Sequence, residues 1–412
     1  MGRRGHHIVV GLDIGTTKIC AIIGDVKSDG VVDVLGVGIH PSRGLKKGVV
    51  VNIDSTVESI RQAVDDAQLM AGIEVGSVYV GIAGGHITGI NSTGIIAVKN
   101  QEITAREIEK VIDAARVVAL PRDREGIHVL PQEFIVDDHD GILDPLGMSG
   151  VRLEARVHIV TAAVTSAHNI VKCVNKADLE VEDIVLEQLA SAETMLSPDE
   201  RELGVILIDI GGSSTNIALI SGHAVQHTAV LGIGGQHITS DLAYGLNTTL
   251  PEAERLKKTY GCAYSPMAGM HEILDVRSLG EREPQRLTRI DLCDIIEPRM
   301  EEILQMVLHE IKQSGYAEGA KSGVVITGGT ALLPGIVELA EDVFRLPARC
   351  GVPTGIGGVV EMVNSPMYAT GVGLLQFALK QHHYGRFQKS TDDHLFGKIY
   401  HRMRDWFGEF LA

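Results

Sequence analysis

Two strand–turn–strand patterns, about 200 residues apart, constrain the fold of this chain more than any other feature. Residues 8–23 consist of an apolar run, the turn DIGTTK that begins at Asp13, and a second apolar run. The same order returns at residues 204–220, where the turn DIGGSS begins at Asp209. Apolar, β-branched runs on both sides of a glycine turn are typical of strands. The sequence therefore predicts an internal duplication and an α/β protein with two similar halves.

The residue types in these turns favour phosphate binding. Glycine beside a small hydroxyl residue lets backbone N–H groups come close to a phosphate chain, and Lys18 adds a positive charge. Asp13 and Asp209 are candidates to hold Mg²⁺ through water, because Mg²⁺ keeps several waters and uses one or two carboxylates. Either turn alone could be an ordinary hairpin. The two together, with the glycine-rich loop at residues 328–330, predict nucleotide binding, although no Walker A motif or dinucleotide fingerprint occurs.

The composition indicates a folded, acidic protein. With 412 residues, 44% of them hydrophobic, the chain is long enough for about two to four domains with their own cores. Its net charge of −16 argues against a nucleic-acid binder, which needs basic surface to neutralise phosphates. Five scattered cysteines without C-x-x-C spacing predict neither disulfides nor a zinc site. With no signal-peptide pattern and no apolar run of about 18 residues, we expect the body in the cytosol.

The middle of the chain changes character. Charges alternate around residues 102–116, and a stretch rich in glycine, proline and aspartate follows at 137–150, which predicts a small inserted α/β domain. Apolar spacing predicts helices at 55–70, 169–176 and 289–313, with Asp54 and Ser55 as candidate caps for the first. Patterning is lost from about residue 381, which predicts a linker. The remaining histidines have no ligand-spaced partners, and we expect them to be solvated.

Residues 395–412 predict an amphipathic helix. At about 100° per residue, nine large apolar side chains fall on one half of the helix and the charged side chains fall outside it. They are Leu395, Phe396, Ile399, Tyr400, Met403, Trp406, Phe407, Phe410 and Leu411. Bulky aromatic residues with flanking lysine and arginine are typical of a helix that lies on a membrane surface. A terminal helix docked on the protein's own core is the alternative.

The order of the motifs resembles the actin-like ATPase superfamily. The motifs are DIGTTK at 13–18, LEQLASA at 186–192, DIGG at 209–212, GGQHIT at 234–239, ERLKK at 254–258 and TGGT at 327–330. Within it, the chain is similar to the FtsA family of bacterial cell-division proteins, because LPQEF and DPLGMSGVRLEA at 130–155 resemble a subdomain that actin lacks. The resemblance covers nearly all of residues 7–380 and the tail.

The resemblance implies an actin-like two-lobed ATPase fold built from duplicated ribonuclease-H-like domains, with an FtsA-type insert and a C-terminal amphipathic helix. It divides the chain into subdomain 1A (7–84, 161–203 and 363–380), the insert 1C (85–160), subdomain 2A (204–232 and 318–362), subdomain 2B (233–317), a flexible linker (381–394) and the membrane helix (395–412).

The resemblance also implies ATP and Mg²⁺ in a cleft between the halves. Around the phosphates it places Gly15, Thr16, Thr17, Lys18, Gly211, Gly212, Ser213 and Ser214. Around the adenosine it places Gly235, Glu254, Lys257, Lys258, Gly328, Gly329 and Thr330. Glu187 matches a glutamate that positions the metal or the attacking water in related chaperone ATPases. Glu254 and Lys258 are four residues apart and could instead simply pair on a solvated helix face.

Three residues depart from the superfamily pattern. Asn216 stands where the second loop commonly carries aspartate, Ser213 where it has glycine or alanine, and Gln188 where proline is frequent after the glutamate. None of these changes removes a hydrogen-bond donor to a phosphate, so nucleotide binding should survive. We expect hydrolysis to be slow and the protein to be mainly structural.

The function that the resemblance implies is the tethering of polymers of tubulin-like FtsZ to the cytoplasmic face of the inner membrane at the division septum. The protein would also polymerise with itself and recruit later division proteins. Arg299 is similar to a position where the acidic C-terminal peptide of FtsZ docks, but an ion pair with Glu297 or Glu301 is the alternative. Two rival functions stay open. A sugar-type kinase would need a catalytic base that we cannot nominate, and a pilus or microcompartment adaptor would not be expected to carry the 130–155 segment.

Overall fold

The computed structural model describes residues 7–27, 30–269, 273–276 and 285–384. The predicted C-terminal helix lies outside these residues, as does the predicted linker from residue 385 onward. Within the described part, no helix is both long enough and apolar enough to cross a bilayer.

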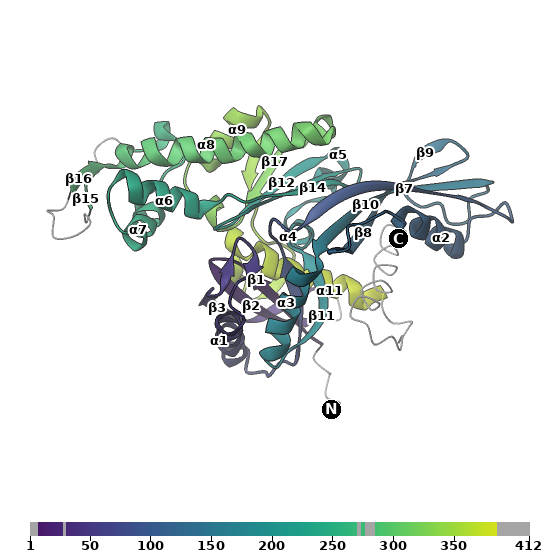
Figure 1. Cartoon of the computed structure of the whole chain (residues 1–412), viewed down its shortest axis with the longest axis horizontal. Coiled ribbons are helices and arrows are strands. Elements are labelled where there is room, and N and C mark those ends of the chain that lie inside the picture. Colours follow the sequence, from purple (N-terminus) through teal and green to yellow (C-terminus); the bar gives the residue numbers. More distant parts are fainter. Residues whose placement is uncertain (1–6, 28–29, 270–272, 277–284, 385–412) are drawn as a thin grey trace.

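Two sheets form the centres of two lobes (Figure 1). The first sheet contains, in spatial order, β11 (Glu180–Leu186), β6 (Ser77–Ile82), β1 (Ile8–Ile14), β2 (Lys18–Val26), β3 (Val32–Pro41) and β19 (Ile356–Gly358). The second contains β14 (Ala224–Leu231), β13 (Thr215–Ser221), β12 (Val205–Ile210), β17 (Val324–Thr327) and β18 (Ala348–Cys350). In each lobe the leading strand, β1 or β12, pairs antiparallel with the next strand and parallel with a later one.

The registers of the two hairpins match residue for residue. Asp13 lies opposite Cys20 in β1–β2, and Asp209 lies opposite Asn216 in β12–β13. Both aspartates therefore occupy the last pair but one before the turn, which brings them to the same corner of each lobe. The predicted duplication and the two-lobed α/β fold are confirmed.

Helices flank both sheets. In the first lobe they are α1 (Ile53–Ala71), α3 (Val164–Lys176), α4 (Glu187–Met195), α10 (Val360–Val363) and α11 (Ala369–Tyr384). In the second lobe they are α6 (Gly235–Gly245), α7 (Leu250–Tyr260), α8 (Arg289–Ser314) and α9 (Ile336–Phe344), with a hairpin of β15 (Ile273–Val276) and β16 (Gln285–Thr288). The three predicted helices are confirmed. The first is capped not by Asp54 or Ser55 but by Asn52, whose side chain accepts a hydrogen bond from the Ser55 N–H.

Within the part of the chain that the structure describes, two segments cross between the lobes: α5 (Pro198–Leu203) and the segment that joins β18 to β19. Arg349 on β18 fastens the two crossings together. Its Nε lies 2.7 Å from Glu200 Oε1 on α5, and its Nη2 donates to the Met195 carbonyl at 2.7 Å. The lobes therefore share one connected hinge region.

An inserted unit lies between β6 and α3 and extends away from the β15–β16 hairpin (Figure 1). It has a four-stranded sheet of β7 (Thr88–Ala97), β10 (Arg152–Ala163), β8 (Arg124–Val136) and β9 (His139–Ile142), with α2 (Ala105–Arg116). Val111, Phe134 and Leu153 belong to its own apolar core, separate from the cores of the lobes. The predicted small α/β insert is confirmed.

The insert also docks on β14 of the second lobe through buried polar groups. His158, 1% exposed, lies with Nδ1 2.6 Å from Asn91 Oδ1 and Nε2 2.8 Å from Thr228 Oγ1. His128 is also buried and accepts a hydrogen bond from the Leu186 N–H at 3.0 Å. The expectation that the remaining histidines are solvated is therefore wrong for these two, because long-range contacts satisfy their rings. Burial lowers the pKa of His158 to about 3, so it stays neutral.

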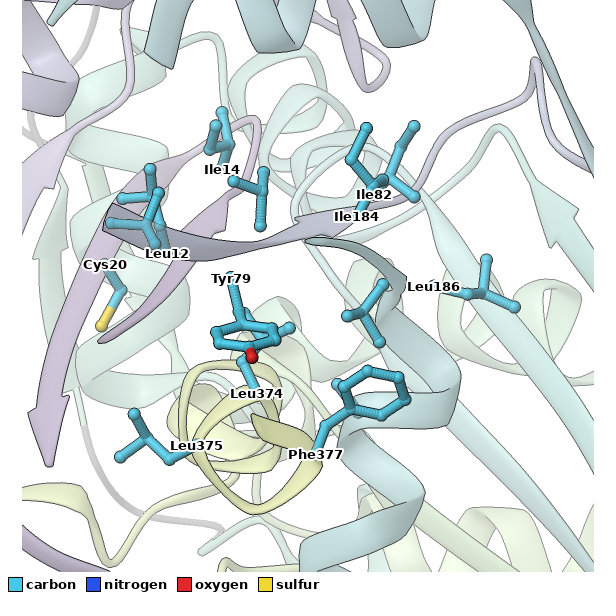
Figure 2. Packing of buried hydrophobic residues seen from close by; sticks show 14 of the residues in the cluster. Leu12, Ile14, Cys20, Tyr79, Ile82, Ile184, Leu186, Leu374, Leu375 and Phe377 are labelled. Atoms are coloured by element: carbon cyan, nitrogen blue, oxygen red, sulfur yellow. The ribbon is translucent and has the colours of Figure 1, made fainter. Parts of the chain in front are cut away.

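Helix α11 fills the centre of the first lobe. Figure 2 shows the common apolar core that it forms with β1, β6 and β11, in which Leu374 and Phe377 lie near Tyr79. The helix comes so close to α4 that a Cβ at Gly373 would lie 1.8 Å from the Ala190 carbonyl oxygen. It extends through Tyr384, beyond the predicted start of the linker at residue 381.

We expect Gly373→Ala to lower the free energy of unfolding by about 1–3 kcal/mol, because overpacking forces α11 away from α4. Thermal or denaturant unfolding measures this loss. Gly76→Ala is the matched control, because a Cβ there meets nothing within 4 Å. If the Gly373→Ala and Gly76→Ala variants unfold with equal free energies, α11 can shift to accommodate the added Cβ and the overpacking argument is wrong.

Candidate functional site

The turns of the two hairpins meet face to face between the lobes. A Cβ at Gly212 would lie 1.9 Å from Thr17 Oγ1, so the second turn approaches the first as closely as its backbone allows. Ser213 Oγ donates to Thr16 Oγ1 at 2.9 Å, and the Gly48 N–H donates to the same oxygen at 3.2 Å. Gly48 lies between the two short strands β4 (Leu45–Lys46) and β5 (Val49–Val50). The sequence prediction that these turns belong to one site is consistent with this contact.

A third loop and the start of α6 pack behind the second turn. Gly328 has φ +86°, and a Cβ there would lie 2.3 Å from Asp209 Oδ1. Thr330 Oγ1 donates to the Gly211 carbonyl at 3.0 Å, and the Gly235 N–H donates to that carbonyl at 3.0 Å. Only glycine fits at positions this close to neighbouring backbone. The loops therefore form a cradle of main chain with few side chains.

Buried charges lie at the base of this cradle. Asp13, Asp209 and Glu187, the first residue of α4, are each less than 10% exposed. Lys18 Nζ lies 3.6 Å from Asp13 Oδ2 and 5.3 Å from the centre of the Tyr368 ring, and it makes no hydrogen bond within the described residues. A buried ammonium group with its donors unpaired is suited to an anionic ligand.

The carboxylates perturb one another. Burial, with Asp13 nearby, raises the pKa of Asp209 to about 7. Burial and the neighbouring Asp13 and Asp209 hold the pKa of Glu187 well above its usual range. Asn216 Nδ2 donates to Glu187 Oε2 at 3.2 Å, and Asp209 accepts a hydrogen bond from the Thr370 side chain. Such an excess of buried negative charge is stabilised by a cation.

The predicted adenosine residues on α7 are already engaged. Lys257 Nζ lies 2.6 Å from Glu254 Oε2 and donates to the Gly235 carbonyl at 2.9 Å, and it is only 8% exposed. Lys258 Nζ lies 3.2 Å from Glu254 Oε1, so the simple i, i+4 pair that we left open does form. Lys257 thus supports the turn at Gly235 from behind. A Cβ added at Gly329 in the third loop would meet nothing within 4 Å, so there is open space beside this residue.

Arg299 lies on α8, well away from these loops in the chain. Its Nε lies 2.5 Å from Asp241 Oδ2 on α6, and its Nη1 contacts Glu302. The alternative partners Glu297 and Glu301 are not the ones used. Glu297 instead accepts from the Ser265 N–H at 3.0 Å.

The residues fit a nucleotide with Mg²⁺. The glycine cradle offers backbone close enough for phosphate oxygens, Lys18 offers an ammonium group that makes no hydrogen bond within the described residues, and the carboxylates are the oxygen ligands that Mg²⁺ prefers. No cluster of three or more His, Cys, Asp or Glu side chains in the described residues is arranged to hold a metal ion alone. Water and phosphate would have to complete its coordination.

Comparison with known proteins identifies the family. The family described as "Cell division protein FtsA" matches residues 206–373, and "SHS2 domain inserted in FTSA" matches residues 84–161. The cell division protein FtsA of Pseudomonas aeruginosa is 50% identical over 374 residues, which cover 91% of this chain and 90% of that protein. The chain belongs to the FtsA family. It is therefore an actin-like cell-division protein. FtsA of Neisseria meningitidis serogroup B, at 43% identity over 90% of this chain and 89% of its own, agrees.

Two solved structures with this fold share less sequence identity with the chain than these FtsA relatives do. The "PilM-PilN type IV pilus biogenesis complex" matches with a TM-score of 0.65 at 17% identity, over 90% of this chain and 98% of that one. "MreB5 of Spiroplasma citri bound to ADP" matches with a TM-score of 0.55 at 13% identity, over 91% and 98%. These likenesses show the actin-like fold alone. The FtsA relatives decide against the pilus-adaptor and kinase alternatives.

Sequence analysis of this FtsA-family chain missed two residues of the site, Tyr368 and Thr370. The Lys18 ammonium lies over the Tyr368 ring. The Thr370 side chain hydrogen-bonds to Asp209, and its Oγ1 lies 3.1 Å from Ser191 Oγ. Both follow Asn364–Pro366, in a segment that the resemblance included without assigning roles to its residues. Nothing in the local pattern indicates that the start of α11 returns to the first residues of the chain.

We expect Asp209→Asn to raise the midpoint of thermal unfolding of the ligand-free protein at pH 8 by about 3 °C or more. The pKa of Asp209 is raised on folding, so the unfolded state loses its proton first and stability falls as pH rises from about 4 to 7. The neutral amide removes that loss, and its advantage should be smaller at pH 5. Asp140→Asn, on the exposed β9, is the control. A variant less stable than wild type at pH 8 would contradict the burial argument.

Proposed function

We propose that this protein binds ATP with Mg²⁺ between its lobes and tethers FtsZ polymers to the cytoplasmic face of the inner membrane at the division site. It assembles into filaments on the membrane, with the insert as a contact between copies, and recruits later division proteins. The observation that carries the nucleotide part is the meeting of the two hairpin turns over buried charges. Membership of the FtsA family supports the division part.

The roles of the residues follow from their contacts. The turns at Gly15–Lys18 and Gly211–Ser214 bind the phosphates, and Asp13 and Asp209 hold Mg²⁺ through water. The loop at Gly328–Thr330 with Glu254 and Lys258 borders the adenosine, while Lys257 props the Gly235 turn. The bound nucleotide supplies the phosphate charge that offsets Lys18. Burial and the neighbouring Asp13 and Asp209 raise the pKa of Glu187. Asn216, which stands where the superfamily pattern has aspartate, donates a hydrogen bond to the same carboxylate, and from this departure we infer slow hydrolysis.

The tail provides the membrane contact. From residue 376 onward, six basic and four acidic residues give +2, whereas the rest of the chain carries −18. Anionic lipid therefore repels the body and weakly attracts the tail, so the apolar face of residues 395–412 supplies most of the binding energy.

We expect Phe407→Glu to abolish sedimentation of the full chain with anionic vesicles, and with it the recruitment of FtsZ polymers to those vesicles. A charge on the apolar face costs more than the helix gains from its remaining contacts. His401→Glu adds the same charge on the polar face and is the matched control. Cosedimentation with and without FtsZ measures both steps. Unchanged vesicle binding by the Phe407→Glu chain would overturn the membrane assignment.

The FtsZ peptide docks at Arg299, where it competes with the protein's own carboxylates. Arg299 is partly exposed but already paired with Asp241 and Glu302. An acidic peptide must therefore displace an internal partner. The ion pair between Arg299 and Asp241 therefore weakens the binding of the peptide.

We expect Asp241→Asn to tighten binding of a labelled FtsZ C-terminal peptide about 2- to 5-fold, the range of a surface ion pair. Arg299→Ala should weaken it, and both effects should shrink at high salt. Fluorescence anisotropy gives the affinities, with Asp140→Asn as the charge-matched control. If Asp241→Asn binds no tighter than that control, the peptide does not use Arg299.

A further inference from the structure

Two of the residues that depart from the superfamily pattern bridge the lobes. Ser213 Oγ, on the second hairpin, donates to Thr16 Oγ1 on the first at 2.9 Å. Asn216 Nδ2, on β13, donates to Glu187 Oε2 on α4 of the first lobe at 3.2 Å. Glycine or alanine at position 213 has no hydroxyl, and aspartate at 216 has no N–H to donate. Both bridges therefore depend on residues at which this chain departs from the superfamily pattern.

The third departure adds a bridge of the same kind. Gln188 Nε2, on α4, donates to the Ala229 carbonyl on β14 at 3.4 Å. Its length makes it weaker than the other two. All three hydrogen bonds join the first lobe to the second.

The Asn216 bridge is shielded from water, and the Ser213 bridge is shielded in part. Ser213 is 4% exposed, Asn216 3% and Glu187 8%, whereas Thr16 is half-buried. A hydrogen bond between such groups is expensive to break, because opening must leave donors and acceptors unpaired until water reaches them. The bonds also join protein atoms directly, so they need no ligand to form.

We propose that Ser213 and Asn216 form a latch that holds the two lobes closed on each other at the base of the cleft, and that this latch slows the exchange of nucleotide. The second part rests on the nucleotide-binding function proposed above, and the first part does not. Rotation of the lobes about the hinge region at α5 and β18–β19 would open the cleft, and the latch at the hairpins opposes such a rotation.

The closed state can be measured in the ligand-free full chain with one spin label in each lobe. Gln62 on α1 and Tyr244 on α6 are exposed, and cysteines at these positions carry the labels. Four of the five native cysteines are buried, and Cys350→Ser removes the fifth. Electron–electron resonance should give one narrow distance for the parent chain. Ser213→Ala with Asn216→Ala should add a longer-distance population, and Ser213→Ala alone a smaller one.

The control is Ser240→Ala with Asn175→Ala, which removes a hydroxyl and an amide from exposed helix positions. It should match the parent chain. Thermal unfolding of each variant confirms that it is folded before its distances are compared. Identical distance distributions in the parent chain and both Ser213 variants would overturn the latch.

Release of a fluorescent ATP analogue with Mg²⁺ tests the second part. Each lost bridge should speed release about 2- to 10-fold, the range of one hydrogen bond, while the control pair leaves the rate unchanged. Failure of the parent chain to bind the analogue would defeat the nucleotide proposal but leave the distance measurement valid. Normal binding with equal release rates in all variants would defeat the effect of the latch on exchange.

Discussion

Three carboxylates buried where the two lobes meet are the constraint on which the rest of the structure depends. Burial in a medium of low polarity disfavours charge, and the pKa of Asp209, raised to about 7, reflects this. The fold supplies partial compensation from separate parts of the chain: Lys18 beside Asp13, Asn216 against Glu187, and Thr370 against Asp209. The negative charge that these contacts leave uncompensated is the electrostatic reason to expect a cation at this site.

The same region shows why glycine at the turns cannot be exchanged for larger residues. A Cβ added at Gly212 would lie 1.9 Å from Thr17 Oγ1, and one added at Gly328, where φ is +86°, would lie 2.3 Å from Asp209 Oδ1. Helix α11 obeys a similar limit where Gly373 meets α4. The first turn of α11 carries Thr370, which hydrogen-bonds to Asp209, and the middle of the helix lies in the apolar core (Figure 2). One helix therefore contributes both to the packing of the first lobe and to the geometry of the site.

Sequence reasoning reached the fold through local repetition. Each of the matching turns at Asp13 and Asp209 combines apolar strand residues, a glycine turn and a carboxylate within a few positions. Local patterns of this kind can be recognised in a sequence without knowledge of the fold. It missed contacts that exist only once distant segments meet. The burial of His158 depends on Thr228 of another lobe, and Tyr368 reaches Lys18 across most of the chain. The N-cap of α1 was missed for a different reason, since Asn52 lies outside the apolar pattern used to find the helix.

The polarity of the cleft also bears on what kind of protein this is. A turnover enzyme needs its lobes to open in each cycle and needs a base ready to accept a proton. Here the lobes are joined by Ser213 and Asn216, and the pKa of Glu187 is raised by burial and by the neighbouring Asp13 and Asp209. We infer that such a site favours retention of the proposed nucleotide over its consumption. That balance suits a protein whose assembled state matters more than its rate of turnover.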